Sequence, residues 1–189
     1  LGFVVHEIEF GNGRKGLASA FFSRLTPEIP VAFKLLPGVY QPADVPMIMI
    51  GIGAGVSPLF SIIEDRKQHN CKTPALLLFG TRHEAESKPM VELFEKEKTS
   101  GVLTNALYAF SRDHGDKKYY IPHLMEDNKE AIWNIWKDPA AARYYCGPAL
   151  GIPEQIKAIL EQLVVEKLGI PPQDAAKIAK GHTWYIESF

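Results

Sequence analysis

The sequence predicts an α/β fold with an open five-stranded parallel sheet and helices on both faces. Short continuous apolar runs, at residues 47–50 and 75–79, are typical of parallel strands buried on both faces. Segments with helical character separate the expected strands, as they do in parallel sheets. A glycine-rich turn directly follows the first run. We therefore expect a ligand site beyond the carboxyl ends of the strands, where such sheets bind their ligands.

The expected elements divide the chain into two parts. In the larger part, strands are expected at residues 47–50, 75–79, 102–109, 142–146 and 183–187. Helices are expected at residues 57–68, 88–98 and 152–167 and in two stretches within 119–136. The smaller part holds a loose strand at 3–10, a loop at 11–16, a short helix at 17–25 and a strand at 30–36. Three prolines within residues 37–46 mark the expected boundary, so we assign residues 1–42 and 43–189 to separate domains.

The composition narrows the classes of function. With 46% hydrophobic and 23% charged residues, the chain has the balance of a soluble globular protein, and its net charge of -1 does not indicate a nucleic-acid partner. The two cysteines and six histidines lack metal-binding spacings, so no metal site is expected. No GxSxG elbow or P-loop is present, which argues against hydrolase and kinase-like functions.

The same features suggest where the protein acts. Few cysteines, no signal peptide and no membrane-spanning apolar run lead us to expect a cytoplasmic location, with a membrane anchor elsewhere in the parent protein left open. The chain opens on Leu1 inside an expected strand, so we expect a piece of a longer polypeptide.

The first candidate site is the turn Gly51–Pro58, which links an expected strand to an expected helix. Its alternating glycines allow a ligand to approach the backbone closely, and the free N–H groups of a helix N-terminus attract an anion. Val56 stands where the standard dinucleotide fingerprint has glycine. A tight turn without a ligand is the alternative interpretation.

The second candidate site follows the expected strand at 102–109. Ser111, Arg112 and Lys118 can converge on a phosphate, and the ring of Tyr120 can stack on a base. Charge-assisted hydrogen bonds of this kind contribute about 1.5–3 kcal/mol each, enough to favour NADP over NAD. Considered alone, this segment favours a solvated polar loop, because charged loops are common.

The third and fourth candidates are the end of the strand at 142–146 and the end of the chain. Cys146 comes last in its strand and is followed by Gly147, which allows a ligand to approach. An inert buried thiol is the alternative, because the sequence shows no neighbouring base. Phe189 could cover a ring system or simply pack beside the last strand.

The ordered set of motifs resembles the ferredoxin–NADP reductase superfamily. Its closest likeness is to the diflavin branch, which includes NADPH–cytochrome reductases, the sulfite reductase flavoprotein subunit and the nitric oxide synthase reductase module. The resemblance covers nearly the whole chain and is strongest over residues 46–147. It implies an NADP-binding domain at residues 43–189, preceded by the C-terminal part of an antiparallel FAD-binding β-barrel at residues 1–42.

The resemblance also implies roles for individual residues. The glycine-rich turn lies under the NADP pyrophosphate and nicotinamide ribose, and Arg82 approaches the nucleotide. The 2′-phosphate is bound by Ser111, Arg112, Lys118 and Tyr120. The implied NADP contacts are Gly53, Ala54, Gly55, Val56, Pro58, Arg82, Ser111, Arg112, Lys118, Tyr120 and Gly147. For catalysis, Cys146 lies near the nicotinamide, Glu187 supports hydride transfer, and Phe189 stacks on the flavin until the nicotinamide displaces it.

Three positions depart from the family pattern. Ala54 replaces a Thr or Ser, Pro122 replaces a common Gln, and Pro148 replaces an acidic residue. Upstream, Gly16, Leu17, Ala18 and Ser19 resemble the loop that binds the FAD pyrophosphate. The Arg-x-Tyr-Ser segment that holds FAD in the family has no match in this chain, and neither does the FMN domain. We therefore expect this chain to bind NADP but to hold FAD weakly or not at all.

The sequence thus favours the NADPH-binding module of a flavoprotein oxidoreductase. In the parent protein, hydride passes from NADPH to FAD, and electrons move on to a flavodoxin-like FMN, haem or iron–sulfur partner, fused or separate. The isolated chain is expected to be inactive alone. Two alternatives stay open at this point: an NADH-preferring flavin reductase, and a non-catalytic nucleotide-binding or docking domain.

Overall fold

The computed structural model describes residue 5, residues 7–34 and residues 44–189. Residues 3, 4 and 6 of the strand expected at 3–10, the last two residues of the strand expected at 30–36 and most of the proposed boundary at 37–46 lie outside the described residues. Everything that positions the candidate site lies within residues 44–189.

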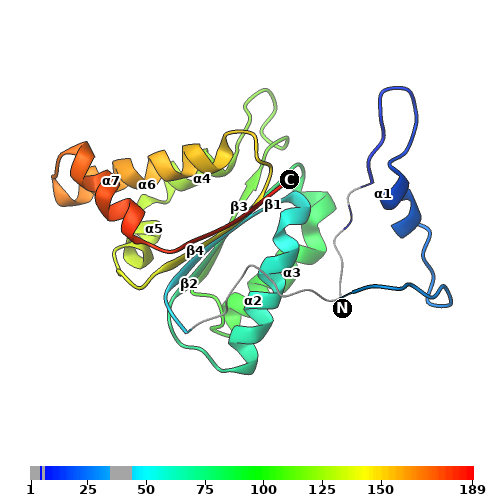
Figure 1. Cartoon of the computed structure of the whole chain (residues 1–189), viewed down its shortest axis with the longest axis horizontal. Coiled ribbons are helices and arrows are strands. Elements are labelled where there is room, and N and C mark those ends of the chain that lie inside the picture. The colour runs from blue at the N-terminus through cyan, green and yellow to red at the C-terminus, as the bar shows by residue number, and fades with distance from the viewer. Residues whose placement is uncertain (1–4, 6, 35–43) are drawn as a thin grey trace.

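The core of the fold is a five-stranded sheet in which every strand is parallel to its neighbours (Figure 1). The strand order is β3-β2-β1-β4-β5. Strands β1 and β2 are almost entirely buried, which explains their continuous apolar sequences. The strands span β1 Met47–Ile52, β2 Ala75–Thr81, β3 Asn105–Phe110, β4 Ala142–Gly147 and β5 Trp184–Ser188. The expected α/β fold with an open parallel sheet is confirmed.

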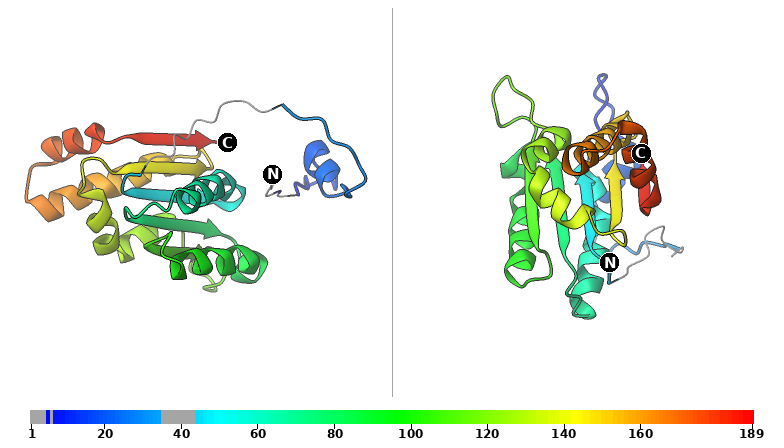
Figure 2. Two further views of the ribbon diagram at one scale, coloured as in Figure 1. Left: turned by 90° about the horizontal axis from the view of Figure 1, so that it is seen from below. Right: turned by 90° about the vertical axis from the view of Figure 1, so that its left-hand side faces the viewer.

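Helices cover both faces of the sheet (Figures 1 and 2). Alternate residues of the strands face opposite sides, so Met47 and Met49 pack under α2 and α3, while Ile48 and Ile50 pack under the remaining helices. The first layer holds α2 Ser57–Gln68 and α3 Glu84–Thr99. The second holds α4 Ile121–Asp127, α5 Lys129–Trp136, α6 Ile152–Leu168 and α7 Pro172–Gly181.

The sequence missed α7 and misjudged the start of α3. The expected helix began at residue 88, but α3 begins at Glu84, so Pro89 lies inside it. Pro89 lies beyond the first turn of α3, so it removes one backbone hydrogen bond, the one to the carbonyl of Ala85. Helix α7 has only ten residues, and its apolar stripe, Ala175, Ile178 and Ala179, contains a single large side chain.

The described N-terminal residues contain little regular structure. Helix α1 Leu17–Phe22 is shorter than the helix expected at 17–25, and one antiparallel bridge joins Glu9 and Lys15. The strand expected at 30–36 is wrong for residues 30–34, which form no ladder. Many apolar side chains in this part are exposed, among them Leu17, which is 91% exposed, and Val5, Ile8, Phe10, Phe21, Ile29, Val31 and Phe33.

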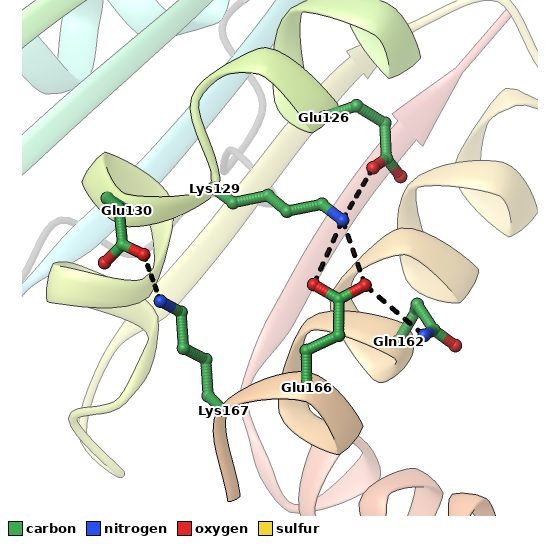
Figure 3. Close-up of polar contacts among 6 residues, drawn as sticks. All are labelled: Glu126, Lys129, Glu130, Gln162, Glu166 and Lys167. Carbon is green, nitrogen blue, oxygen red and sulfur yellow. Dashed lines mark hydrogen bonds and ion pairs between the residues drawn. The ribbon is translucent and has the colours of Figure 1, made fainter.

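Ion pairs join α4 and α5 to α6 (Figure 3). The Lys129 ammonium contacts the Glu126 carboxylate at 2.8 Å and both carboxylate oxygens of Glu166 at 3.0 Å. Lys167 pairs with Glu130 beside them. These contacts lie near the C-terminal ends of α4 and α6, whereas the N-terminal ends of the same helices reach the candidate site. Exposed pairs of this kind contribute about 0.2–1 kcal/mol each, so they fix the position of the helices more than they stabilise the fold.

Candidate functional site

A cavity of about 700 Å³ lies at the carboxyl edge of the sheet. Residues from the ends of β1, β2 and β3, from the segment after β4 and from the chain terminus all line it. Strands β2 and β3 lie on one side of β1, and β4 and β5 lie on its other side. The direction in which the chain adds strands therefore reverses at β1. Such a reversal opens a crevice between the connecting loops, which is where open α/β sheets bind ligands.

The glycine-rich turn after β1 forms the floor of this edge. It is a short 3₁₀ helix, Gly53–Val56, that leads straight into α2. Gly53 has a φ of +58°, a conformation that favours glycine. A Cβ on Gly55 would lie 2.2 Å from the backbone oxygen of Cys146, so no larger residue fits there. The turn therefore lies directly against the end of β4.

The start of α2 adds backbone donors to this floor. The Ser57 hydroxyl donates to the carbonyl of Ala54 at 2.9 Å, and Pro58 occupies the first turn, where a missing N–H costs nothing. Gly53 and Ala54 line the cavity, whereas Gly55 and Val56 are buried behind them. This arrangement gives an anion a helix N-terminus and close access to the backbone.

The loops after β2 and β3 are joined side by side. The Ser111 amide donates to the Thr81 carbonyl and the Arg112 amide donates to the Arg82 carbonyl, both at 2.9 Å, so the parallel pairing continues beyond the strands. Arg82 and Ser111 line the cavity, and Arg112 lies next to them on the surface. Neither arginine forms an ion pair with any residue that the structure describes.

The next wall is the start of α4. The Tyr120 amide donates to Nδ1 of His123 at 3.0 Å, which satisfies one of the unpaired N–H groups at this end of the helix. The Tyr120 ring is half exposed and lines the cavity. Burial and the hydrogen bond that Tyr119 donates to Asp127, at 2.7 Å, raise the pKa of the Tyr119 phenol to about 12. Tyr119 is therefore a neutral hydrogen-bonding group at pH 7.

A second hollow of about 800 Å³ adjoins the first. The two share Tyr119, Pro122 and His123. Lys117 and Lys118 line only the second hollow. A ligand lying along the edge of the sheet from the glycine-rich turn past Ser111 therefore reaches basic side chains at this end.

The end of β4 closes the other side. Cys146 is 4% exposed and does not line the cavity, and Gly147 beside it is also buried. The Tyr145 hydroxyl donates to the Pro148 carbonyl at 2.6 Å and holds the loop after the strand. Pairing of β4 with β5 places Glu187 next to Cys146, but Glu187 is exposed and lies outside the cavity lining.

The last residue of the chain lies over the cavity. The Phe189 amide donates to the Gly147 carbonyl at 3.2 Å, and the Ala149 amide donates to the Phe189 carbonyl at 3.1 Å. The Phe189 ring lines the cavity and is 69% exposed. These two backbone bonds hold an aromatic ring at the cavity mouth, where little else covers it.

The structure thus gathers many of the residues proposed from the sequence at one edge. Gly53, Ala54, Arg82, Ser111, Tyr120 and Phe189 line the main cavity, and Lys118 lines the second hollow. The lining also includes Glu86 and Gln155, which the sequence analysis did not single out. Both are polar residues within helices, so no local motif distinguishes them from solvated side chains. Pro122 and Pro148, two of the departures from the family pattern, are part of the lining as well.

The proposed FAD loop belongs to the N-terminal part of the chain. Gly16 precedes α1, while Leu17, Ala18 and Ser19 form its first turn. The Ser19 hydroxyl donates to the Gly16 carbonyl and accepts from the Ile8 amide, both at 3.1 Å. None of these four residues lines the main cavity.

Comparison with known proteins identifies the family of this domain. The family model described as the oxidoreductase NAD-binding domain matches residues 49–152, which run from β1 to the start of α6 and include most of the cavity lining. The chain belongs to this family. The domain therefore has a nucleotide-binding fold in the region where the glycine-rich turn and the Ser111–Arg112 loop meet.

The full-length relatives of the domain are diflavin reductases. The chain is 28% identical over 188 residues to an NADPH–cytochrome P450 reductase of Drosophila melanogaster, which covers 94% of the chain and 27% of that protein. It is 30% identical over 169 residues to the sulfite reductase [NADPH] flavoprotein component of Saccharomyces cerevisiae, covering 85% of the chain and 16% of the relative. A third relative, the NADPH-dependent diflavin oxidoreductase 1 of Schizosaccharomyces pombe, is 30% identical over 200 residues, covering 100% of the chain and 33% of the relative.

These matches confirm the resemblance to the diflavin branch. They also show that the chain spans a third or less of the length of these relatives. Among the residues that the structure describes, no helix is both long and apolar enough to cross a membrane. The same residues contain no cluster of three or more His, Cys, Asp or Glu side chains suited to a metal ion.

Proposed function

We propose that this chain is the NADPH-binding module of a flavoprotein oxidoreductase. The observation that carries the proposal is the cavity at the carboxyl edge, which brings the glycine-rich turn, Arg82, Ser111 and a terminal aromatic ring together from separate parts of the chain. The residues suit NADPH because a close backbone floor, basic side chains and a hydroxyl are what a pyrophosphate and a ribose phosphate require.

In the parent protein the bound nicotinamide supplies a hydride, and FAD accepts it and releases the electrons singly to a redox partner. The part played by this chain is binding and orientation. Gly53 and Ala54 let the dinucleotide lie against the start of α2, and Arg82 approaches the nucleotide. The residues that select the phosphorylated ribose are Ser111, Arg112, Lys118 and Tyr120. Phe189 occupies the cavity mouth until the nicotinamide enters, and Cys146 and Glu187 support the transfer from the ends of β4 and β5. A cytoplasmic location of the parent protein is part of this proposal.

The residues before 43 are proposed to be the C-terminal part of an FAD-binding barrel. The exposed apolar side chains between Val5 and Phe33 support this, because such residues normally pack against neighbouring strands. We expect the 189-residue chain to bind NADP without retaining FAD and to be inactive alone. Purified chain that carries one flavin per molecule would show this expectation to be wrong.

The test of the proposed function is calorimetric titration of the chain with NADP and with NAD at matched salt. We expect micromolar binding of NADP and much weaker binding of NAD. Arg112→Ala should weaken NADP binding on the order of 10- to 100-fold, because a charge-assisted hydrogen bond contributes about 1.5–3 kcal/mol. NAD binding should change little. Arg14→Ala removes an equal charge from the N-terminal loop and should leave both affinities unchanged. Equal losses for NADP and NAD in the Arg112 variant would favour an NADH-preferring reductase.

One observation favours a second candidate, a non-catalytic nucleotide-binding domain. Pro122 and Pro148 line the cavity at positions where the family pattern has a side chain able to form hydrogen bonds. The two candidates differ in turnover. Full-length protein that binds NADP but reduces no acceptor with NADPH would support the second.

A further inference from the structure

The loop that follows β3 is fastened to the start of α3 by one carboxylate. Oδ1 of Asp113 lies 2.7 Å from Nδ1 of His83, and Oδ2 accepts the backbone N–H of Glu84, also at 2.7 Å. Glu84 is the first residue of α3, and the residue before it provides no side-chain cap. Asp113 therefore caps the helix from a different loop and uses both of its oxygens to do so.

These contacts complete a row of four bonds between the same two loops. Thr81 accepts from the amide of Ser111, and Arg82 accepts from the amide of Arg112. The next residue, Asp113, continues the row through its side chain to His83 and Glu84. Within residues 44–189, this is the only position where a side chain, rather than the backbone, joins the Ser111–Arg112 segment to the loop that carries Arg82.

We propose that Asp113 is a positioning residue that sets the preference for a phosphorylated ribose. The inference rests on the proposed function, because it concerns how the loop holds Ser111 and Arg112 toward the 2′-phosphate of NADP. Asp113 does not line either hollow, so it acts through its neighbours and not through contact with the nucleotide. We call the contacts of Asp113 with His83 and Glu84 the Asp113 clamp. Without this clamp, the end of the loop keeps only backbone bonds to the loop that carries Arg82.

The sign of the effect separates this role from simple electrostatics. Asp113 is an anion close to a site proposed to bind a phosphate dianion. If its charge alone mattered, its removal would tighten NADP binding by reducing repulsion. If it positions the loop, its removal weakens NADP binding despite the lost repulsion. The two explanations thus predict changes in opposite directions.

The experiment measures NADP and NAD affinities of Asp113→Asn by calorimetric titration, beside Asp116→Asn as the matched control. Asp116 lies in the same loop, carries the same charge and forms no hydrogen bond or ion pair among the described residues. We expect NADP binding of the Asp113 variant to weaken about fivefold or more, with NAD binding within about twofold of the wild type. The control should bind NADP as tightly as the wild type or slightly more tightly. His83→Ala removes one of the two contacts and should give a smaller loss in the same direction.

Each outcome decides one of the two ideas. A wild-type chain that prefers NADP, with an Asp113→Asn variant that keeps or increases this preference, overturns the positioning role and leaves the proposed function intact. A wild-type chain without preference for NADP overturns the proposed function and this inference with it. Parallel loss of NADP and NAD binding, with a lower melting temperature, also overturns the inference, because it indicates a structural role alone. Faster amide exchange at Glu84 in the variant would verify that the clamp had been released.

Discussion

Gly55 lies so close to Cys146 that a Cβ on it would meet the backbone oxygen of Cys146 at 2.2 Å. The obstructing atom belongs to the backbone of β4, a buried central strand, so it has little freedom to move away. This approach brings the turn after β1 and the end of β4 together at the point where the strand order reverses. The glycine is therefore needed for the geometry of the site itself, before any contact with a ligand.

We expect Gly55→Ala to destabilise the chain and to impair NADP binding. Overpacking of a core typically costs about 1–3 kcal/mol, and a rigid backbone neighbour favours the upper part of that range. Chemical denaturation would measure the loss of stability, and calorimetry would measure the affinity. Gly181→Ala is the matched control, because a Cβ on Gly181 meets nothing within 4 Å. A Gly55 variant as stable as the control would contradict the close approach.

Phe189 should compete with a ligand for the cavity mouth. Its ring lines the cavity, while its backbone alone makes the bonds to Gly147 and Ala149. Phe189→Ala should therefore keep the fold and open the cavity, because the two backbone bonds survive. We expect NADP to bind at least as tightly to this variant as to the wild type in calorimetric titration.

A control for this prediction is Leu150→Ala. Leu150 is 86% exposed and lies near the same loop, but it does not line the cavity. Its removal should leave NADP affinity unchanged. Weaker NADP binding in the Phe189 variant alone would indicate that the ring stacks on the bound nucleotide and does not compete with it.

The centre of the sheet could be predicted from the sequence because its three inner strands, β2, β1 and β4, are buried on both faces. Residues 47–50 and 75–79 have no polar residue, and burial on both faces is what such runs predict. The glycine-rich turn could be located because its three alternating glycines directly follow the first of these runs. Helix α7 was missed because it is short and two of the three residues in its apolar stripe, Ala175 and Ala179, are small.

The candidate site was predictable only where its residues form local motifs. Ser111 and Arg112 follow a strand directly, and that adjacency is visible in the sequence. The clamp between Asp113 and His83 joins residues 30 positions apart, and its existence depends on the pairing of β2 with β3. Glu86 and Gln155 reach the cavity from helices whose placement the sequence does not specify. Such residues become apparent only once the fold brings the loops together.

The Asp113 clamp should also make stability depend on pH. The hydrogen bond from the Glu84 amide, and then the contact with His83, hold the pKa of Asp113 below its usual value of 3.8, with His114 adding a small favourable charge. Because the folded-state pKa is the lower one, the contribution of the clamp is present above about pH 3.8 and is lost as the pH falls through the folded-state pKa. The difference in melting temperature between the wild type and Asp113→Asn should therefore be largest near neutral pH and vanish in strong acid. A difference that stays constant down to pH 2 would contradict the ionised clamp.

Two buried arginines should respond in opposite ways to the same substitution. Arg143 is 0% exposed, and its guanidinium nitrogens have no hydrogen-bond partner among the described residues. It lies between two indoles, with its guanidinium carbon 4.8 Å from the ring centroid of Trp136 and 5.4 Å from that of Trp184. Arg66 is equally buried, but its guanidinium donates to the carbonyl and hydroxyl of Thr73.

Burial lowers the pKa of Arg143 to about 9, so at pH 7 the group is charged in both the folded and the unfolded states and the full cost of burying the charge opposes folding. That cost is several kcal/mol, and the two desolvated cation–π contacts return about 2 kcal/mol each, so together they do no more than offset it. Arg143→Met keeps an apolar side chain of similar length between the indoles and should leave the free energy of unfolding unchanged or raise it. Arg66→Met should lower it, because the Thr73 carbonyl loses its donor. Denaturant unfolding of both variants at pH 7 would measure these changes. Equal losses of unfolding free energy would mean that the two indoles compensate the charge of Arg143 as fully as hydrogen bonds compensate that of Arg66.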